Sequence, residues 1–315
     1  MSAVSESSRR LLRATEKTGG KLRKATSSRG ATIAAFIIAT IWTIPTFGLF
    51  VSSFREASDI KTSGWWTALA NPSFTLENYA QAFVSGDSLS LSKAFLNSLV
   101  ITIPAAIIPI ILASLAAYAF AWIDFKGRNT LFVLVFALQI VPIQMALVPL
   151  LQLFSDGVQI GGLYILPGLG VNGLDGAYAK VWIAHTIFAM PLAIFMLHNF
   201  ISEIPGEVIE AARVDGAGHG TIFARIVLPL ATPAIASFGI FQFLWVWNDL
   251  LVATVFTSGG ELPITKALQD LSGSYGQSWE LLTAGAFISM IIPLTVFFVL
   301  QRFFVRGLLA GASKG

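Results

Sequence analysis

Cysteine is absent from this chain of 315 residues, and charged residues make up only 12% of it. The absence of cysteine excludes disulfide bonds and any metal site that is built from thiolates. Soluble proteins usually have about a quarter of their residues charged, so the shortage of charge argues against that class. Apolar residues account for 55% of the chain, and we therefore predict an integral membrane protein.

Sequence motifs for nucleotide, zinc and ester chemistry are missing as well. No phosphate-binding loop of the form G-x-x-x-x-G-K-[ST] occurs, because Gly19-Gly20-Lys21 lacks both the first glycine and the hydroxyl residue. There is no H-E-x-x-H zinc helix and no G-x-S-x-G elbow, and the three histidines are scattered. We predict that the chain is not an enzyme and has no catalytic residue, no metal site and no bound cofactor.

Six stretches are apolar and long enough to cross a bilayer, for which about 20 residues suffice. They are residues 31–53, 99–123, 131–154, 177–197, 230–255 and 281–304. Few ionisable residues interrupt them, the clearest being Asp249 and, after it, His185. Carriers that are coupled to ion gradients usually place several such residues in the membrane. We therefore predict transport that is powered by a partner.

Basic residues fall mostly on one side of these stretches. Several precede the first stretch, and Lys126, Arg128, Arg213 and Arg225 lie in the connections after the second and the fourth. Because cytoplasmic segments are enriched in lysine and arginine, both termini and residues 201–229 are predicted to be cytoplasmic. This placement accounts for the formal net charge of +3, so we predict no nucleic-acid partner.

The remaining segments are short. Residues 1–30 are serine-rich and basic and predict a disordered cytoplasmic tail; a secretory signal is excluded because its positive region would be too long and no cleavage pattern follows. Residues 54–92 predict short amphipathic helices on the outer surface. The glycine-rich residues 155–176 and residues 257–280 predict external loops. One membrane domain, residues 31–315, is predicted.

Residues 201–229 predict two short helices with a tight turn between them. Pro205 suits the start of the first helix, and Glu207 is favoured by the helix dipole. Gly216 ends that helix, since glycine adopts left-handed backbone angles without strain. The second helix is predicted over residues 221–228 and would be ended by Pro229.

The same segment follows the spacing E-A-A-x3-G-x9-I-x-L-P. The matching residues are Glu210, Ala211, Ala212, Gly216, Ile226, Leu228 and Pro229. This pattern resembles the cytoplasmic EAA loop of ABC importer permeases, by which the membrane subunit holds its ATPase. An ordinary connecting loop is the alternative for any short motif. The full spacing and the flanking membrane spans favour the coupling loop.

The resemblance implies a role for individual residues of the loop. Glu210 would pair with a basic group of the ATPase, while Ala211 and Ala212 would permit close docking and Gly216 would make the turn. Asp215 and Arg213 could face the partner or be paired within the chain. His219 could touch the partner or cap the second helix.

The resemblance extends over nearly everything after residue 31. Residues 74–79, residues 95–99 and Trp247-Asn248-Asp249 are similar to carbohydrate-importing permeases, in particular the smaller membrane subunit of the maltose type. It implies an all-α, polytopic type I ABC importer permease with six transmembrane helices in the cell inner membrane. It also implies a second homologous permease subunit, two ATPase subunits that bind ATP and magnesium, and an extracytoplasmic sugar-binding protein.

The fifth span is the best candidate for a solute pathway. Gln242, Trp245 and Asp249 are spaced for one helical face, with Asn248 beside them. An aromatic ring with amide and carboxylate groups suits a sugar, whose C–H faces stack while its hydroxyls form hydrogen bonds. The alternative is that these polar groups brace neighbouring helices. The same two interpretations apply to Gln139 and Gln144 in the third span.

The resulting hypothesis is a permease subunit of an ATP-driven importer of an oligosaccharide or α-glucoside, such as a maltose- or trehalose-like sugar. One alternative keeps the fold but changes the solute to an amino acid, a peptide or a polyamine. The other is a stand-alone carrier or channel, which the coupling loop argues against.

Overall fold

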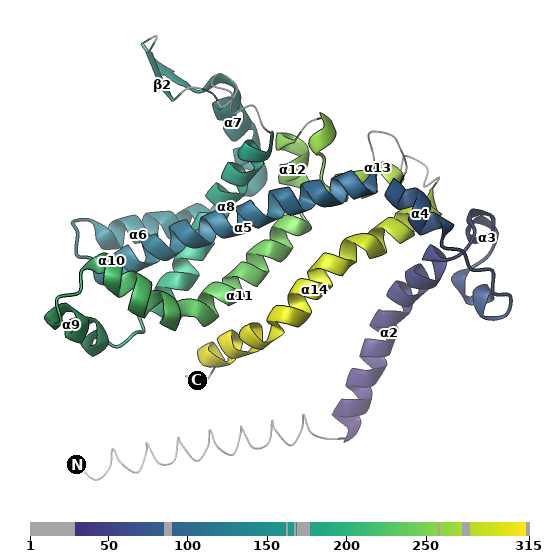
Figure 1. Ribbon diagram of the computed structural model, residues 1–315, viewed down its shortest axis with the longest axis horizontal. Coiled ribbons are helices and arrows are strands. Elements are labelled where there is room, and N and C mark those ends of the chain that lie inside the picture. Colours follow the sequence, from purple (N-terminus) through teal and green to yellow (C-terminus); the bar gives the residue numbers. More distant parts are fainter. Residues whose placement is uncertain are drawn as a thin grey trace. The chain divides into compact units, whose positions relative to one another are not determined.

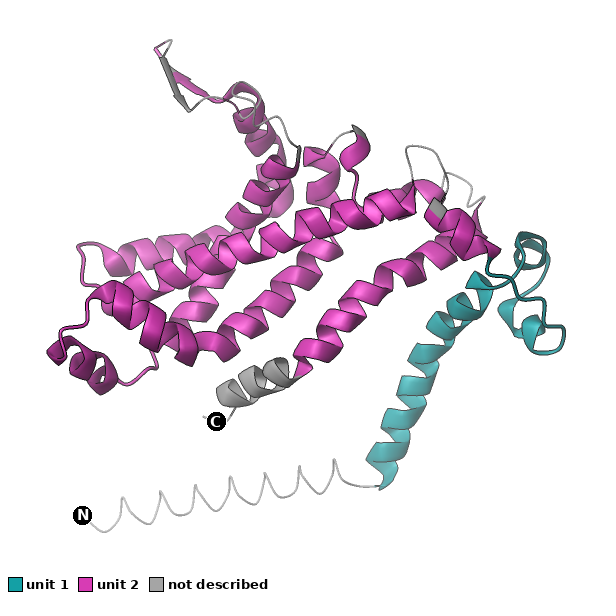
Figure 2. Cartoon of the chain, in the orientation of Figure 1, with its two compact units in different colours: residues 1–76 teal, residues 77–315 magenta. Residues whose placement is uncertain are grey.

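The computed structural model describes residues 29–84, 90–161, 163–166, 168, 177–257, 259–272 and 278–312. The chain divides into two compact units, residues 1–76 and residues 77–315, which are coloured separately in Figure 2. All but the last two residues of the predicted disordered tail, residues 1–30, lie outside the described residues.

Unit 1 consists of one long apolar helix and the short helices that follow it. These are α2 (Arg29–Ser53), α3 (Ala57–Thr62) and the 3₁₀ helix η1 (Trp65–Leu69). Trp65 packs edge-on against Phe47 with ring centroids 5.8 Å apart, and Gly48 leaves room for its indole. The buried guanidinium of Arg55 donates a hydrogen bond to the carbonyl of Ser63 at 3.2 Å. Helix α2 thus covers the first predicted span, residues 31–53, and short helices follow it within residues 54–92.

Unit 2 contains the other helices, of which the α-helices are labelled in Figure 1. They are α4 (Glu77–Val84), α5 (Leu91–Trp122), α6 (Arg128–Ala137), η2 (Leu138–Ile140), α7 (Ile143–Asp156), α8 (Ala177–Ile201), α9 (Gly206–Val214), α10 (His219–Ile222), the π turn η3 (Phe223–Val227), α11 (Leu228–Trp247), α12 (Leu251–Phe256), η4 (Gly259–Glu261), α13 (Ile264–Ser272) and α14 (Trp279–Ala312).

Helices α5 and α8 make the most extensive contact of unit 2 and run side by side in Figure 1. Alanines supply much of the shared core, and six of them have no exposed surface: Ala105, Ala113, Ala117, Ala184, Ala189 and Ala193. Such small side chains let two membrane helices approach closely, which strengthens their van der Waals contact. Helix α11 packs against both α5 and α8, and α14 packs against α11.

Five described helices are long and apolar enough to cross a membrane. They are Arg29–Ser53, Leu91–Trp122, Tyr178–Ile201, His219–Trp247 and Trp279–Gln301. The sixth candidate is a bent pair, Arg128–Ile140 and Ile143–Asp156, whose two halves meet at 105°. An all-α fold with six crossing segments is confirmed when that pair is counted as one.

The third predicted span, residues 131–154, is not one continuous helix. The helix stops before Pro142, which has no backbone N–H to continue the ladder. Proline also disfavours helical angles in the residue before it, and Val141 accordingly has extended backbone with ψ 118°.

The fifth span also differs from its predicted limits, 230–255. The helix begins at His219 and runs without a break through η3 to Trp247, so the prediction that Pro229 separates two helices is wrong. In the π turn the N–H of Leu228 donates to the carbonyl of Phe223, and this wide turn accommodates the hydrogen bond that Pro229 cannot make. After Asn248 the helix ends, and α12 begins at Leu251.

The predicted external loops contain regular structure. Within residues 155–176, β1 (Val158–Ile160) and β2 (Leu163–Leu166) form an antiparallel hairpin, the one sheet among the described residues. Helix α13 occupies the middle of residues 257–280. Residues 162, 167, 169–176, 258 and 273–277 of these predicted loops lie outside the described residues.

Candidate functional site

Helix α9 of the candidate coupling loop ends in a left-handed turn at Gly216, where φ is +82°. The N–H of Gly216 donates to the carbonyl of Arg213 at 3.0 Å, and the N–H of Ala217 donates to the carbonyl of Ala212 at 2.9 Å. These two bonds form a Schellman motif, in which glycine is preferred because a Cβ strains the left-handed angles. The prediction that Gly216 ends the first helix is therefore confirmed.

The two alanines of the motif differ in exposure. Ala212 is half-buried and packs on the core cluster that contains the buried Ile209 and Ile222, whereas Ala211 is exposed beside the exposed Glu210. Close packing at Ala212 therefore serves the chain itself, which leaves Ala211 as the position available for close contact with another protein. Residues Ile226 and Leu228 are half-buried, and Pro229 is exposed.

The charged groups of the loop also differ, because one is bonded within the chain and two are exposed. Arg213 donates a hydrogen bond to the carbonyl of Trp122 at 3.1 Å, so it is paired within the chain. Neither Glu210 nor Asp215 makes a side-chain hydrogen bond or ion pair with another residue of the described ranges, and both are exposed. Their carboxylates are free to meet a basic partner.

Val214 is a surface residue that the sequence motif does not identify. Its side chain is 88% exposed at the last position of α9, next to the exposed Ala211 face. A single exposed apolar side chain is common on protein surfaces, so Val214 adds to the docking face only together with the exposed Glu210 and Ala211 of the same helix. An apolar residue between Arg213 and Asp215 was the only available signal in the sequence.

Two cavities near the middle of unit 2 share one side chain, the indole of Trp245. The larger has a volume of about 700 Å³ and is lined by Phe241, Leu244, Trp245, Asn248, Asp249 and Phe297, among others. The smaller, of about 430 Å³, is lined by Gln139, Pro142, Phe188, Pro191 and Trp245, among others. Both breaks in the membrane helices, at Pro142 and at Asn248, border these cavities.

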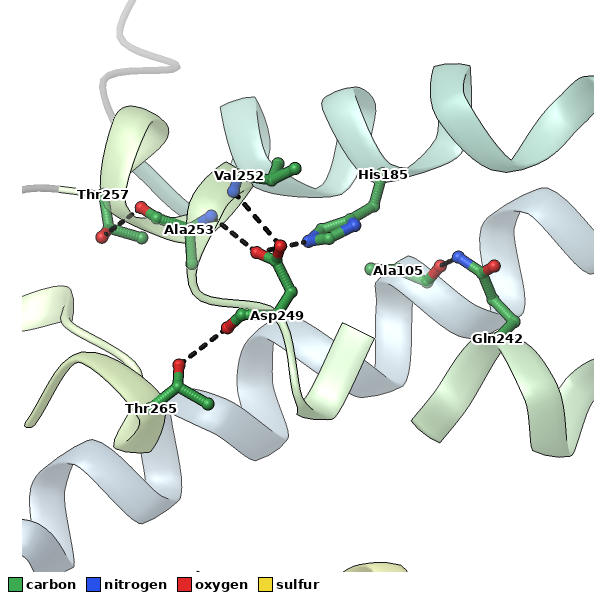
Figure 3. A network of polar contacts seen from close by, with 8 residues as sticks. All are labelled: Ala105, His185, Gln242, Asp249, Val252, Ala253, Thr257 and Thr265. Atoms are coloured by element: carbon green, nitrogen blue, oxygen red, sulfur yellow. Dashed lines mark hydrogen bonds and ion pairs between the residues drawn. The ribbon is translucent and has the colours of Figure 1, made fainter. Parts of the chain in front are cut away.

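Asp249 stabilises the break in the fifth span, as Figure 3 shows. Its carboxylate accepts hydrogen bonds from the N–H groups of Val252 at 3.2 Å and Ala253 at 2.8 Å, which caps α12. The same carboxylate lies 3.6 Å from Nε2 of the buried His185, and Thr265 donates to the Asp249 carbonyl at 2.7 Å. Asp249 therefore braces α8, α12 and α13 besides lining a cavity.

The other predicted pathway residues lie in different surroundings. Gln242 has no exposed surface, and its Nε2 donates to the carbonyl of Ala105 at 3.1 Å, which joins α11 to α5 (Figure 3). Gln144 is exposed on α7 and does not line either cavity. Asn248 is exposed and donates to the carbonyl of Leu244 at 2.8 Å. The structure brings together Gln139, Trp245, Asn248 and Asp249, and leaves Gln242 and Gln144 apart.

Residues 107–310 match the family described as "Binding-protein-dependent transport system inner membrane component". The match covers more than half of the chain, which therefore belongs to this family. The chain is a multi-pass inner-membrane permease subunit of an ABC importer that works with a binding protein and other subunits. Permease subunits are not enzymes, and ATP is hydrolysed by a separate subunit.

Several relatives match along most of the chain. It is 50% identical to the osmoprotective compounds uptake permease protein GgtD of Synechocystis, over 90% of this chain and 91% of that protein. It is 48% identical to the alpha-glucoside transport system permease protein AglG of Rhizobium meliloti, over 84% of this chain and 68% of that protein. It is 32% identical to the melibiose/raffinose/stachyose import permease protein MelC of Bacillus subtilis, over 92% of this chain and 98% of that protein.

Solved structures show the same fold at low sequence identity. A chain of a bacterial alginate importer matches with a TM-score of 0.62 and 18% identity, over 88% of this chain and 98% of its own length. A chain of the methionine transporter MetNI matches with a TM-score of 0.52 and 16% identity, over 69% of this chain and 95% of its own length. Both are chains of ABC transporters, and this likeness shows the type I ABC importer permease fold of the chain.

Proposed function

We propose that this permease carries an oligosaccharide or α-glucoside and that the Trp245 cavities belong to its pathway. The observation that carries the proposal is the position of Trp245 between the two cavities, with Gln139 on one side and Asn248 and Asp249 on the other. The indole offers an apolar plane on which a sugar ring can stack, and the amides can bond to its hydroxyls. The names of AglG and MelC, an alpha-glucoside and a melibiose/raffinose/stachyose permease, support a solute of this class.

The complete importer in this proposal contains a second homologous permease, two ATPase subunits and an extracytoplasmic sugar-binding protein. The exposed face of α9, with Glu210, Ala211 and Val214, docks on an ATPase subunit. ATP closes the ATPase dimer, the docked loop moves with it, and the cavities open to the outside to receive the sugar. Hydrolysis then returns the permease to its inward-open form.

Replacement of Trp245 by alanine is expected to change the order in which sugars are preferred. The purified importer with its binding protein would be assayed for ATP hydrolysis stimulated by maltose, trehalose, sucrose and melibiose. Loss of a stacking surface should weaken apparent affinity several-fold for the sugars that use it, since such contacts are worth about 1 kcal/mol. The matched control is Gln242→Met, which keeps the volume of a buried residue outside both cavities.

An unchanged order of sugars in Trp245→Ala, with a lowered melting temperature, would remove Trp245 from the pathway. If amino acids or peptides stimulated ATP hydrolysis and no sugar did, the proposed solute class would be wrong.

Orientation gives a second prediction, because both termini and the coupling loop are proposed to be cytoplasmic. Single cysteines at Asp215 and Gln269, both exposed, can be introduced into this cysteine-free chain. A membrane-impermeant maleimide applied to intact spheroplasts should label Gln269→Cys and spare Asp215→Cys until the membrane is permeabilised. If only the Asp215→Cys chain were labelled in intact spheroplasts, the proposed topology would be wrong.

A further inference from the structure

The coupling loop is attached to the membrane core at a buried aromatic side chain. Nδ1 of His219, the first residue of α10, shares a hydrogen bond of 2.9 Å with Oη of Tyr118 on α5. Tyr118 is only 4% exposed, and its ring also packs against Phe223 with centroids 5.3 Å apart. The loop therefore has a directional contact with α5 in addition to apolar packing.

A second contact holds the other side of the Schellman turn. Arg213 donates to the carbonyl of Trp122, the last residue of α5, and Nε1 of Trp122 donates to the carbonyl of Ile201, the last residue of α8, at 3.3 Å. Arg213 precedes Gly216 and His219 follows it. The exposed Val214 thus lies between two points at which the loop is hydrogen-bonded to the core.

The space beneath the loop is filled by one apolar cluster. Ile209 and Ile222 of the loop belong to the same buried cluster as Tyr118 on α5 and Leu197 on α8. A densely packed core transmits displacement instead of absorbing it. Apolar contacts, however, have little directional preference, so packing alone allows the loop to slide along α5, whereas a hydrogen bond fixes its position.

We propose that Tyr118 and His219 are positioning residues that transfer movement of the docked loop to α5, with Arg213 holding the other side of the turn. The proposal rests on the docking role given to this loop above. It assigns the transfer to one hydrogen bond beneath the loop and not to the exposed docking residues. Tyr118 is buried and would contact neither the ATPase nor the sugar.

The test is the amount of sugar taken up per ATP hydrolysed by the complete importer in proteoliposomes. Tyr118→Phe removes only the hydroxyl and keeps the ring, and His219→Phe keeps a planar side chain. Either variant should lower uptake of labelled maltose or trehalose per ATP about fivefold, the size expected for one lost hydrogen bond. The double variant should be no worse than either single variant, because both remove the same interaction.

Tyr178→Phe is the matched control. Tyr178 also donates a hydrogen bond from its hydroxyl between α8 and α5, to Oδ1 of Asn97 at 2.7 Å, but far along the chain from the loop. A structural role alone would make the two tyrosine variants alike in melting temperature and in uptake per ATP. The proposal requires that only Tyr118→Phe lowers the ratio.

Equal ratios in Tyr118→Phe and the wild type, in an importer whose wild type couples sugar to ATP hydrolysis, would overturn this proposal and leave the docking role intact. A wild-type importer in which no sugar stimulates ATP hydrolysis would overturn the proposed function and this inference with it.

Discussion

Replacement of Gly216 by proline is expected to abolish ATP-driven uptake while leaving the chain in the membrane. Proline holds φ near −65°, whereas Gly216 has φ +82°, and it removes the N–H that donates to Arg213. Proline cannot adopt these angles, so the change destabilises the turn by more than about 1 kcal/mol, and α9 would not be held in the orientation that presents Glu210, Ala211 and Val214. Uptake, ATP hydrolysis and co-purification of the ATPase subunits would be measured on the solubilised importer.

Two matched controls distinguish loss of the turn at Gly216 from the effect of placing proline or alanine at another glycine. Gly206→Pro places the same residue at the first position of α9, where proline is tolerated. Gly127 has the same φ of +82° and the same open surroundings as Gly216, so Gly127→Ala and Gly216→Ala impose equal backbone strain. Only the change at Gly216 should reduce association with the ATPase. Normal uptake in Gly216→Pro would show that this loop is not the docking site.

Asp249→Ala is expected to lower the stability of the importer and to reduce uptake of every sugar by the same factor. The change removes the cap of α12 and the carboxylate beside His185, and the lost cap alone corresponds to about 1–2 kcal/mol of unfolding free energy. Melting temperature and uptake of the sugar panel would be compared with those of the wild type.

Asn248→Ala is the neighbouring control for this change. Asn248 is exposed, and its one described side-chain bond returns to its own helix, so its removal should leave the melting temperature nearly unchanged. If Asp249→Ala kept the wild-type melting temperature but altered the order of sugars, Asp249 would be a solute contact instead of a brace.

Local preferences in the sequence predicted part of this site well. The left-handed turn at Gly216 depends on residues within one turn of helix, and glycine is the residue that adopts it without strain. The positions of the apolar spans follow from length and hydropathy, which are likewise local properties. These features need no knowledge of the neighbouring helices.

Other features could not be predicted because they depend on packing. Ala211 and Ala212 are chemically identical, and only the rotation of α9 decides which of them is buried. Hydropathy continues across Pro142 and Asn248, so an average over a window does not detect the breaks. Proline is no better a guide, since Pro104 and Pro109 lie inside the unbroken α5 whereas Pro142 ends a helix.

The continuity of the helix from His219 to Trp247 joins the docking loop and the Trp245 cavities in one element of 29 residues. The element changes direction between α10 and α11 (Figure 1), and the part beyond the bend, the 20 residues of α11, is about 30 Å long at a rise of 1.5 Å per residue. A tilt of α11 by about 5° around the end nearer the loop would carry its other end through roughly 3 Å, which is comparable to the thickness of a sugar ring. A small rotation of an ATPase subunit would thus be amplified by the length of this lever, without any rearrangement inside the helix itself.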